Sequence, residues 1–356
     1  MKFIRTCHEV RGRWLASPSR LAFERHIGRA SARGICRVFG VRRRTLIAGG
    51  LAVGTAAGIG GCETMQRSAL AGLSAAPPNP APRSFDLASG LRLHAIQTGW
   101  VAVKRPHRAF GGADRLALPA IMASASWTEW MPVRAWAIEH PEGVIVVDTG
   151  ETARVNAPDY PACDAVTGWF YRRNLKFAID EADEIGPQFG ALRLDQQAVR
   201  TVAMTHLHSD HMGGMGWLER ATFLVSGRDA NGHAGALMCR VPDRRRLRAV
   251  SHDGPRRGAF AGSHAVTADG SIVLVPTPGH TNGHQSILIE DGDRSWLLAG
   301  DAAFDLAQIE NGTQAGIAED RAAARATLAL LKRQAAEHGT IVLPTHDSEA
   351  LSRIEG

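Results

Sequence analysis

The sequence predicts an α/β fold, because short apolar runs alternate with helical stretches along the chain. Residues 144–147 (VIVV) are typical of a buried strand and lead into the turn 148–150 (DTG), and residues 199–204 form a second such run. The clearest helix is residues 320–338, where Asp320 is placed to cap the first turn and Gly339 follows the end. The other predicted strands are residues 271–275, 286–289, 296–298 and 341–343.

The 356 residues are enough for one large domain and a leader, and the apolar and charged fractions, 44% and 21%, are ordinary for a globular protein. The net charge of +6 is unevenly distributed. Residues 1–62 hold 12 Lys or Arg and 2 Asp or Glu, whereas residues 63–356 hold the remaining 29 basic and 33 acidic residues. The globular part is therefore slightly acidic, and we expect no nucleic-acid partner.

Residues 41–62 have the layout of a bacterial export signal: an arginine cluster, 17 uncharged residues rich in Ala, Gly and Leu, and a small-residue site. The arginines at 42–44 resemble a twin-arginine signal, which predicts a periplasmic protein. The sequence IGGC at 59–62 resembles a lipobox, so lipidation of Cys62 would attach the protein to a membrane. A transmembrane anchor is the alternative, and a translation start downstream of residues 1–40 is also open.

The sequence divides into residues 1–62, which hold the extension and signal; residues 63–84, a Pro/Ala-rich linker expected to be extended and unpacked; and residues 85–356, the folded domain. Five cysteines occur and none forms a C-x-x-C pair, which argues against a zinc ribbon or a redox dithiol. Cys163 and Cys239 remain once the leader is removed. They could pair in an oxidising compartment, but we expect two separate buried thiols.

Four ligand-type side chains fall within six residues directly after the predicted strand 199–204. They are His206, His208, Asp210 and His211. Side chains two residues apart in an extended segment point the same way, so the H-x-H pair can share one ion. Imidazole and carboxylate groups without thiolates suit a borderline cation such as zinc in a catalytic setting.

Three more polar groups follow predicted strands. His280 comes after residues 271–275, Asp301 after 296–298, and His346 after 341–343. Loops at the carboxyl ends of strands gather functional groups in α/β folds, so we expect these side chains to lie near the histidine cluster.

The order H-x-H-x-D-H, then G-H, G-D and H, resembles the metallo-β-lactamase superfamily over roughly residues 85–350, and residues 147–150 (VDTG) match the family's structural aspartate turn. The resemblance implies an αββα sandwich with metals at one edge, and makes residues 85–356 the catalytic domain. It also implies two Zn²⁺ ions, the first held by His206, His208 and His280, the second by Asp210, His211 and His346, with Asp301 as a bridge.

The same resemblance implies a hydroxide held between the two metals, which attacks a carbonyl that the metals polarise. Asp210 is the expected catalytic residue, placed to move a proton to the leaving group. His284 lies just beyond His280, and we expect it to support a ligand rather than to bind metal.

Local sequence is most similar to the N-acyl-homoserine lactonase branch, notably residues 283–286 (GHQS), 297–302 (LLAGDA) and 345–347 (THD). We therefore predict zinc-dependent hydrolysis of a lactone or ester in a small-molecule substrate. The same fold also hosts hydrolases of β-lactams, thioesters and phosphodiesters, which remain alternatives. A persulfide dioxygenase with one iron is a weaker alternative, and a non-catalytic binding protein is disfavoured because no ligand is lost.

One position departs from the lactonase pattern. That branch carries a tyrosine three residues after the bridging aspartate, where its hydroxyl meets the substrate carbonyl, and here the residue is Phe304. Phe304 cannot donate a hydrogen bond, so the departure puts specificity for acyl-homoserine lactones in doubt, but not lactone or ester hydrolysis.

Two further segments bear on the substrate. Residues 121–131 are apolar and aromatic, and Trp127, Trp130 and Met131 are expected either to line an acyl groove or to pack in the core. Residues 244–248 (RRRLR), together with Arg256 and Arg257, are expected to form a solvated surface, with an anion-binding rim as the alternative.

Overall fold

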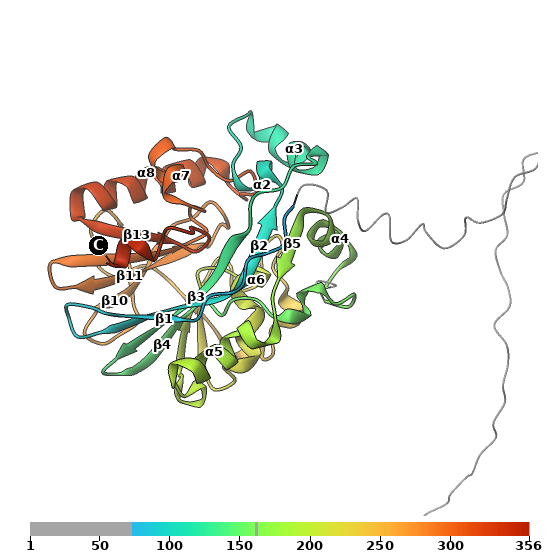
Figure 1. Cartoon of the computed structure of the whole chain (residues 1–356). Helices are drawn as coiled ribbons and strands as arrows, with labels where there is room; N and C mark the ends of the chain where they lie inside the picture. The colour runs from blue at the N-terminus through green and yellow to red at the C-terminus, as the bar shows by residue number, and fades with distance from the viewer. Residues whose placement is uncertain (1–72, 161–162, 356) are drawn as a thin grey trace, which may run out of the picture. The chain divides into compact units, whose positions relative to one another are not determined.

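In the computed structural model, the structure describes residues 73–160 and 163–355. The proposed export signal, the arginines at 42–44 and Cys62 lie outside the described residues. Two β-sheets form the centre of the domain (Figure 1). The strands of the first sheet are β1 (Arg83–Asp86), β2 (Arg92–Val103), β3 (Met131–His140), β4 (Gly143–Val147), β5 (Leu175–Ala178), β6 (Thr201–Ala203), β7 (Thr222–Ser226) and β8 (Leu247–Val250).

The second sheet contains five strands, β9 (His264–Ala265), β10 (Ile272–Pro276), β11 (Gln285–Asp291), β12 (Arg294–Gly300) and β13 (Thr340–Pro344). The helices are α2 (Arg105–Arg108), α3 (Ala117–Ala123), α4 (Ala165–Asn174), α5 (Ile185–Leu192), α6 (Ser209–Met212), α7 (Leu306–Asn311), α8 (Arg321–His338) and α9 (Ser352–Glu355).

The first sheet runs in the order β1-β2-β3-β4-β6-β7-β8, antiparallel as far as β4 and parallel from β4 onward. The long β2 carries two partners along one edge, with β1 beside its first residues and β5 beside its last, Trp100–Val103. The second sheet has the order β13-β12-β11-β10-β9 and is antiparallel except for the β12–β13 pair. The parallel pairs place the carboxyl ends of β4, β6 and β7 together, and those of β12 and β13.

Alternation along the strands explains why the two sheets pack face to face. In β10, Ile272 and Leu274 lie in the core between the sheets, whereas Val273 and Val275 lie in the core beneath α7 and α8. Phe189 of α5 packs likewise on the outer face of the first sheet. Figure 1 shows α8 over the second sheet and α5 against the first. The predicted αββα sandwich is confirmed.

The predicted elements are present with small shifts at their ends. Asp320 caps α8 by accepting hydrogen bonds from the backbone N–H groups of Ala322 and Ala323. The helix ends at Gly339, whose φ of +61° suits glycine. The strand predicted at residues 199–204 is shorter, because only Thr201–Ala203 of that run is strand.

The described part of the Pro/Ala-rich linker, residues 73–82, has no regular secondary structure, as expected, but it contacts the domain. Asn79 Nδ2 donates to the carbonyl oxygen of Gln97 at 2.6 Å, and Trp130 Nε1 donates to that of Ser74 at 2.8 Å. This stretch is therefore extended but not free of the domain, and β1 begins at Arg83, inside the predicted linker.

The prediction of two separate thiols is wrong. Cys163 and Cys239 form a disulfide bond, with Cα atoms 5.5 Å apart and 76 residues between them in sequence. The fold brings the start of α4 against the short 3₁₀ turn Met238–Arg240, a proximity that cysteine spacing alone does not show. Within the described residues no helix has the length and apolar character needed to cross a bilayer.

Candidate metal centre

The predicted ligands converge because each follows the carboxyl end of a strand at the same edge of the sandwich. The segment after β6 carries His206 and His208 and then enters α6. His280 follows β10, while Asp301 directly follows β12. His346 follows β13, which is parallel to β12, so the two loops meet.

The first group of ligand atoms consists of three imidazole nitrogens. His208 Nδ1 lies 2.9 Å from His206 Nε2 and also 2.9 Å from His280 Nε2. A single proton on His208 Nδ1 can serve only one of these contacts, whereas a cation accepts the lone pairs of all three nitrogens. The arrangement therefore fits a bound metal ion better than a hydrogen-bonded cluster.

The second group combines Asp210, His211 and His346, whose ligand atoms all lie within 4.8 Å of one another. His346 Nε2 is 3.5 Å from Asp210 Oδ2. Two nitrogens and one carboxylate oxygen form a typical catalytic zinc site with room for another ligand.

Asp301 lies between the two groups. Its Oδ1 is 3.1 Å from His211 Nε2 and 3.3 Å from His346 Nε2, whereas its Oδ2 is 3.5 Å from His280 Nε2. Asp301 Oδ1 and His211 Nε2 are both buried and have no hydrogen-bond partner among the described residues. Buried polar atoms without partners are costly, and two cations bridged by Asp301 would satisfy them. The residues present therefore fit two metals.

A buried carboxylate holds the second group in place. Asp148 Oδ2 accepts from His211 Nδ1 at 2.8 Å, and its two oxygens also accept from the Thr205 hydroxyl and backbone N–H. Asp148 has a φ of +54°, a conformation that aspartate adopts more readily than most residues. The carboxylate fixes the ring so that Nε2 faces the metal position.

Other contacts fix the remaining rings. His346 Nδ1 lies 2.8 Å from the Pro132 carbonyl oxygen, and His208 Nε2 lies 3.1 Å from that of Ala234. His284 is in none of the ligand groups. Its Nε2 accepts from the backbone N–H of Asp301 at 3.1 Å, and its Nδ1 donates to Thr277, so it positions the bridging aspartate.

Burial sets the ionisation of the first group. It lowers the pKa values of His206 and His208 well below the usual range and that of His280 to about 4, so these rings are neutral and able to bind metal. Burial alone would raise the pKa of Asp301, but the neighbouring His346 and His211 outweigh it and hold that pKa well below its usual value. Burial also raises the pKa of Asp210.

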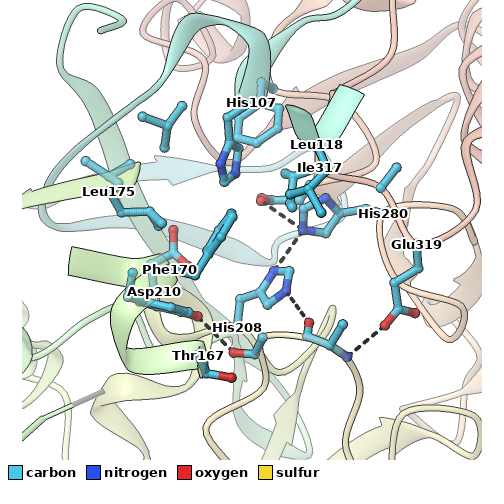
Figure 2. A pocket seen from close by; sticks show the side chains of 18 of the residues that line it. His107, Leu118, Thr167, Phe170, Leu175, His208, Asp210, His280, Ile317 and Glu319 are labelled. Atoms are coloured by element: carbon cyan, nitrogen blue, oxygen red, sulfur yellow. Dashed lines mark hydrogen bonds and ion pairs between the residues drawn. The ribbon is translucent and has the colours of Figure 1, made fainter. Parts of the chain in front are cut away.

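A cavity of about 370 Å³ opens over the ligands, and five of them reach it: His208, Asp210, His280, Asp301 and His346. Figure 2 shows the first three of these in the lining. We call the seven predicted ligands the metal floor. The apolar part of the lining, which we call the apolar wall, consists of Val101, Val103, Leu118, Val166, Phe170, Leu175 and Ile317. The cavity therefore pairs a polar, metal-binding side with a side suited to hydrocarbon.

Phe304, the predicted departure from the lactonase pattern, lies where floor and wall meet. Its ring stacks on His346 with centroids 5.1 Å apart and lines the cavity. Trp127, Trp130 and Met131 are not among the described residues that line this cavity.

Each of those three side chains has another place. Trp127 is buried beneath Lys104, whose Nζ lies 3.7 Å from the ring centroid. Met131 packs in the core beside Phe304, and Trp130 lies with Met131 along a separate hollow that also reaches His346. Core packing thus describes Trp127 and Met131 better than an acyl groove, because the wall is supplied by other segments.

Several cavity residues were not anticipated from the sequence. His107, Tyr171 and Glu319 all line the cavity. His107 and Tyr171 lie well before the first ligand in sequence, whereas Glu319 lies between Asp301 and His346. The Tyr171 hydroxyl donates to the Gly235 carbonyl oxygen at 2.9 Å, which shows how a distant tyrosine reaches the site. The basic residues 244–248 do not line the cavity as described; Arg245 is exposed and pairs with Asp243.

Comparisons with known proteins agree with this geometry. Residues 128–346, more than half of the chain, match the model of the metallo-beta-lactamase superfamily. A probable metallo-hydrolase of Mycobacterium tuberculosis is 31% identical over 177 residues, which cover 47% of this chain; the chain spans 55% of that relative's length. The N-acyl homoserine lactonase AttM of Rhizobium radiobacter is 28% identical over 230 residues, 62% of this chain and 83% of the lactonase.

Solved structures share the fold. An N-acyl homoserine lactone hydrolase with the product N-hexanoyl-L-homoserine at its catalytic metal centre aligns with a TM-score of 0.59 at 19% identity, covering 77% of this chain and 97% of that one. The dizinc quorum-quenching lactonase AidC aligns with a TM-score of 0.54 at 12% identity, covering 75% and 91%. The chain therefore belongs to the metallo-β-lactamase superfamily and is related to its metallo-hydrolases and N-acyl homoserine lactonases.

Proposed function

We propose that the protein is a dinuclear zinc hydrolase that cleaves a lactone or ester bearing an apolar acyl chain. The observation that carries the proposal is the composition of the cavity. Asp301 lies between the two groups of candidate metal ligands, and apolar side chains form much of the remaining lining. The relation to N-acyl homoserine lactonases favours a lactone over other carbonyl substrates.

The donor set suits two zinc ions, which would supply Lewis acidity and a water of lowered pKa. His206, His208 and His280 would hold one ion, and Asp210, His211 and His346 the other. Asp301 would hold both, while Asp148 and His284 orient the second group and the bridge.

Asp210 has a second role in the proposal. Asp210 lines the cavity although only 7% of the residue is exposed, so its carboxylate can reach both a ligand position and the substrate. A carboxylate in this place can carry a proton to the oxygen of the departing alcohol. The apolar wall would meanwhile exclude water from the acyl side of the substrate.

Metal content and a substrate panel test the function. The full-length protein should bind about two zinc ions per chain, because seven ligands exceed what one tetrahedral zinc uses. The zinc-loaded protein should hydrolyse lactones or esters with alkyl chains faster than β-lactams, thioesters or phosphodiesters. One metal equivalent, or iron with persulfide dioxygenase activity, would contradict the proposal.

We also propose that the protein acts in the periplasm. The arginine cluster at 42–44 supports export, and the disulfide between Cys163 and Cys239 is typical of oxidising compartments. A reporter fused after residue 80 should reach the periplasm, and changing all three arginines to lysine should retain it in the cytoplasm. Cys62→Ala should release the exported protein from the membrane fraction. Activity of the intact fusion in the cytoplasm would count against this assignment.

A further inference from the structure

His107 is a buried imidazole in the cavity that belongs to none of the ligand groups. It lies in α2, and only 6% of its surface is exposed. Figure 2 shows the ring directed into the cavity from the side opposite His208 and Asp210. Two backbone hydrogen bonds hold it there: its N–H donates to Lys104 at 2.8 Å, and its carbonyl accepts from Gly316 at 2.9 Å.

The ring of His107 has no partner among the described residues. Nδ1 is buried and unpaired. Nε2 is not among the buried unpaired atoms and makes no hydrogen bond within that part of the chain, so it is the nitrogen open to the cavity. Thr167, Tyr171 and Glu319 also line the cavity outside the metal floor, and the last two are already engaged. The Tyr171 hydroxyl donates to Gly235, and both Glu319 oxygens accept backbone N–H groups, from Ala234 and Asn282.

Aromatic and apolar side chains lie around His107, and the ligands His280, Asp301 and His346 line the same cavity. The rings of Phe170 and Phe304 have centroids 6.2 and 6.5 Å from that of His107, and Val103 and Leu118 line the same side. Burial lowers the pKa of His107 to about 3, so the ring is neutral and carries one N–H donor. A neutral donor in apolar surroundings is matched by a neutral acceptor, because a charged ligand group would lose its hydration without gaining a counter-ion.

We propose that Nε2–H of His107 donates a hydrogen bond to a second carbonyl oxygen of the substrate, one that is not cleaved. The inference rests on the proposed function, which places the scissile carbonyl at the metal floor. It narrows the substrate class to lactones or esters with a neutral carbonyl, such as an amide, at the start of the acyl chain. His107 then hydrogen-bonds to that carbonyl oxygen, while the apolar wall contacts the hydrocarbon part of the acyl chain.

The test compares two substrates in the zinc-loaded full-length protein. One is N-hexanoyl-L-homoserine lactone, and the other is a γ-butyrolactone with an alkyl chain of matched length and no amide. In wild type, kcat/KM should favour the amide substrate. In His107→Leu, the ratio of the two kcat/KM values should fall about tenfold, and the loss should appear in KM, because the lost bond forms in the ground state as well.

His107→Gln is the matched control, since its side-chain amide keeps an N–H donor, and it should recover part of the lost selectivity. Zinc content and the circular dichroism spectrum of both variants report folding and the metal floor separately. An unchanged ratio in His107→Leu, or a loss confined to kcat on both substrates, would overturn the inference about His107. A wild type that cleaves neither lactone would instead overturn the proposed function, and the inference with it.

Discussion

The metal floor and the apolar wall differ in how the chain builds them. Four floor ligands lie within six consecutive residues that lead from β6 into α6, and the other three each follow a strand end. The wall is assembled from β2, α3, α4, β5 and the loop before α8, and none of these elements carries a recognisable motif. The residues of the metal floor can therefore be predicted from sequence motifs, whereas those of the apolar wall can be identified only from the folded structure.

The two regions also differ in polarity and exposure. Six of the seven floor ligands are buried, with His206 and His211 at 0% exposure, and His208 is partly exposed. Two wall side chains reach solvent at the mouth, Leu118 with 54% and Val166 with 74% of their surface exposed. A rigid, charged side can hold metals in one geometry, while an open apolar side accepts ligands of varied shape. In the proposed function, the metal floor would supply the chemistry, whereas the apolar wall and His107 would select the substrate.

The largest expected effect comes from the floor. Asp210→Asn keeps the size of the side chain but removes the charge that binds metal and moves a proton, so kcat should fall about 10²-fold or more. Steady-state kinetics with metal analysis measures it. Asp243→Asn, the same change at a carboxylate that pairs with exposed Arg245, is the matched control. Full activity of the Asp210 variant would separate this residue from the mechanism.

A smaller effect is expected where floor and wall meet. Phe304→Tyr adds a hydroxyl next to His346 and the cavity, and a hydrogen bond from it to charge developing on the carbonyl should raise kcat/KM on acyl-homoserine lactones about tenfold. Zinc content should stay the same. If the tyrosine variant gains nothing while wild type is already fast, Phe304 is only a packing substitution and another donor serves the carbonyl.

Removal of the disulfide between Cys163 and Cys239 is expected to disturb the apolar wall but not the metal floor. The disulfide joins the segment before α4, which carries Val166 and Phe170, to the turn beyond Gly235 of the cavity. Replacing Cys163 and Cys239 by serine should lower the free energy of unfolding by about 4 kcal/mol, as chain entropy predicts for a loop of this length. KM should rise about twofold with kcat retained, because wall side chains lose order while the floor does not. A fall in kcat as large as that of Asp210→Asn would show that floor and wall are coupled.

A change at Glu151 is expected to alter the pH dependence of stability rather than turnover. Burial raises its pKa from 4.5 to about 8, so its carboxyl group is neutral in the folded protein at pH 7. The folded state binds the extra proton between these two values, and its stability must fall as pH rises through that window. Glu151→Gln keeps the shape and removes the titration. Its Tm relative to wild type should rise from pH 5 to pH 9, and an equal difference at both pH values would contradict the shift.

Much of the fold follows from local sequence. The apolar runs became strands, and the cap at Asp320 and Gly339 set the ends of α8, because these signals act over a few residues. The ligand motifs are similarly local, and the family order of His206, His280, Asp301 and His346 predicted which groups meet. The surroundings of Trp127 could not be predicted from the sequence, since an apolar aromatic segment suits both a core and a groove.

The sequence by itself determined the α/β class, the paired ligand groups and the departure at Phe304. Only the tertiary structure decided that Cys163 meets Cys239 and that His107, about 100 residues before the first ligand, turns an unpaired ring into the cavity. The physical reason is the sequence separation over which each interaction acts. Strand periodicity, caps and metal motifs depend on neighbours along the chain, whereas a cavity wall depends on which distant side chains remain after both sheets have buried their faces.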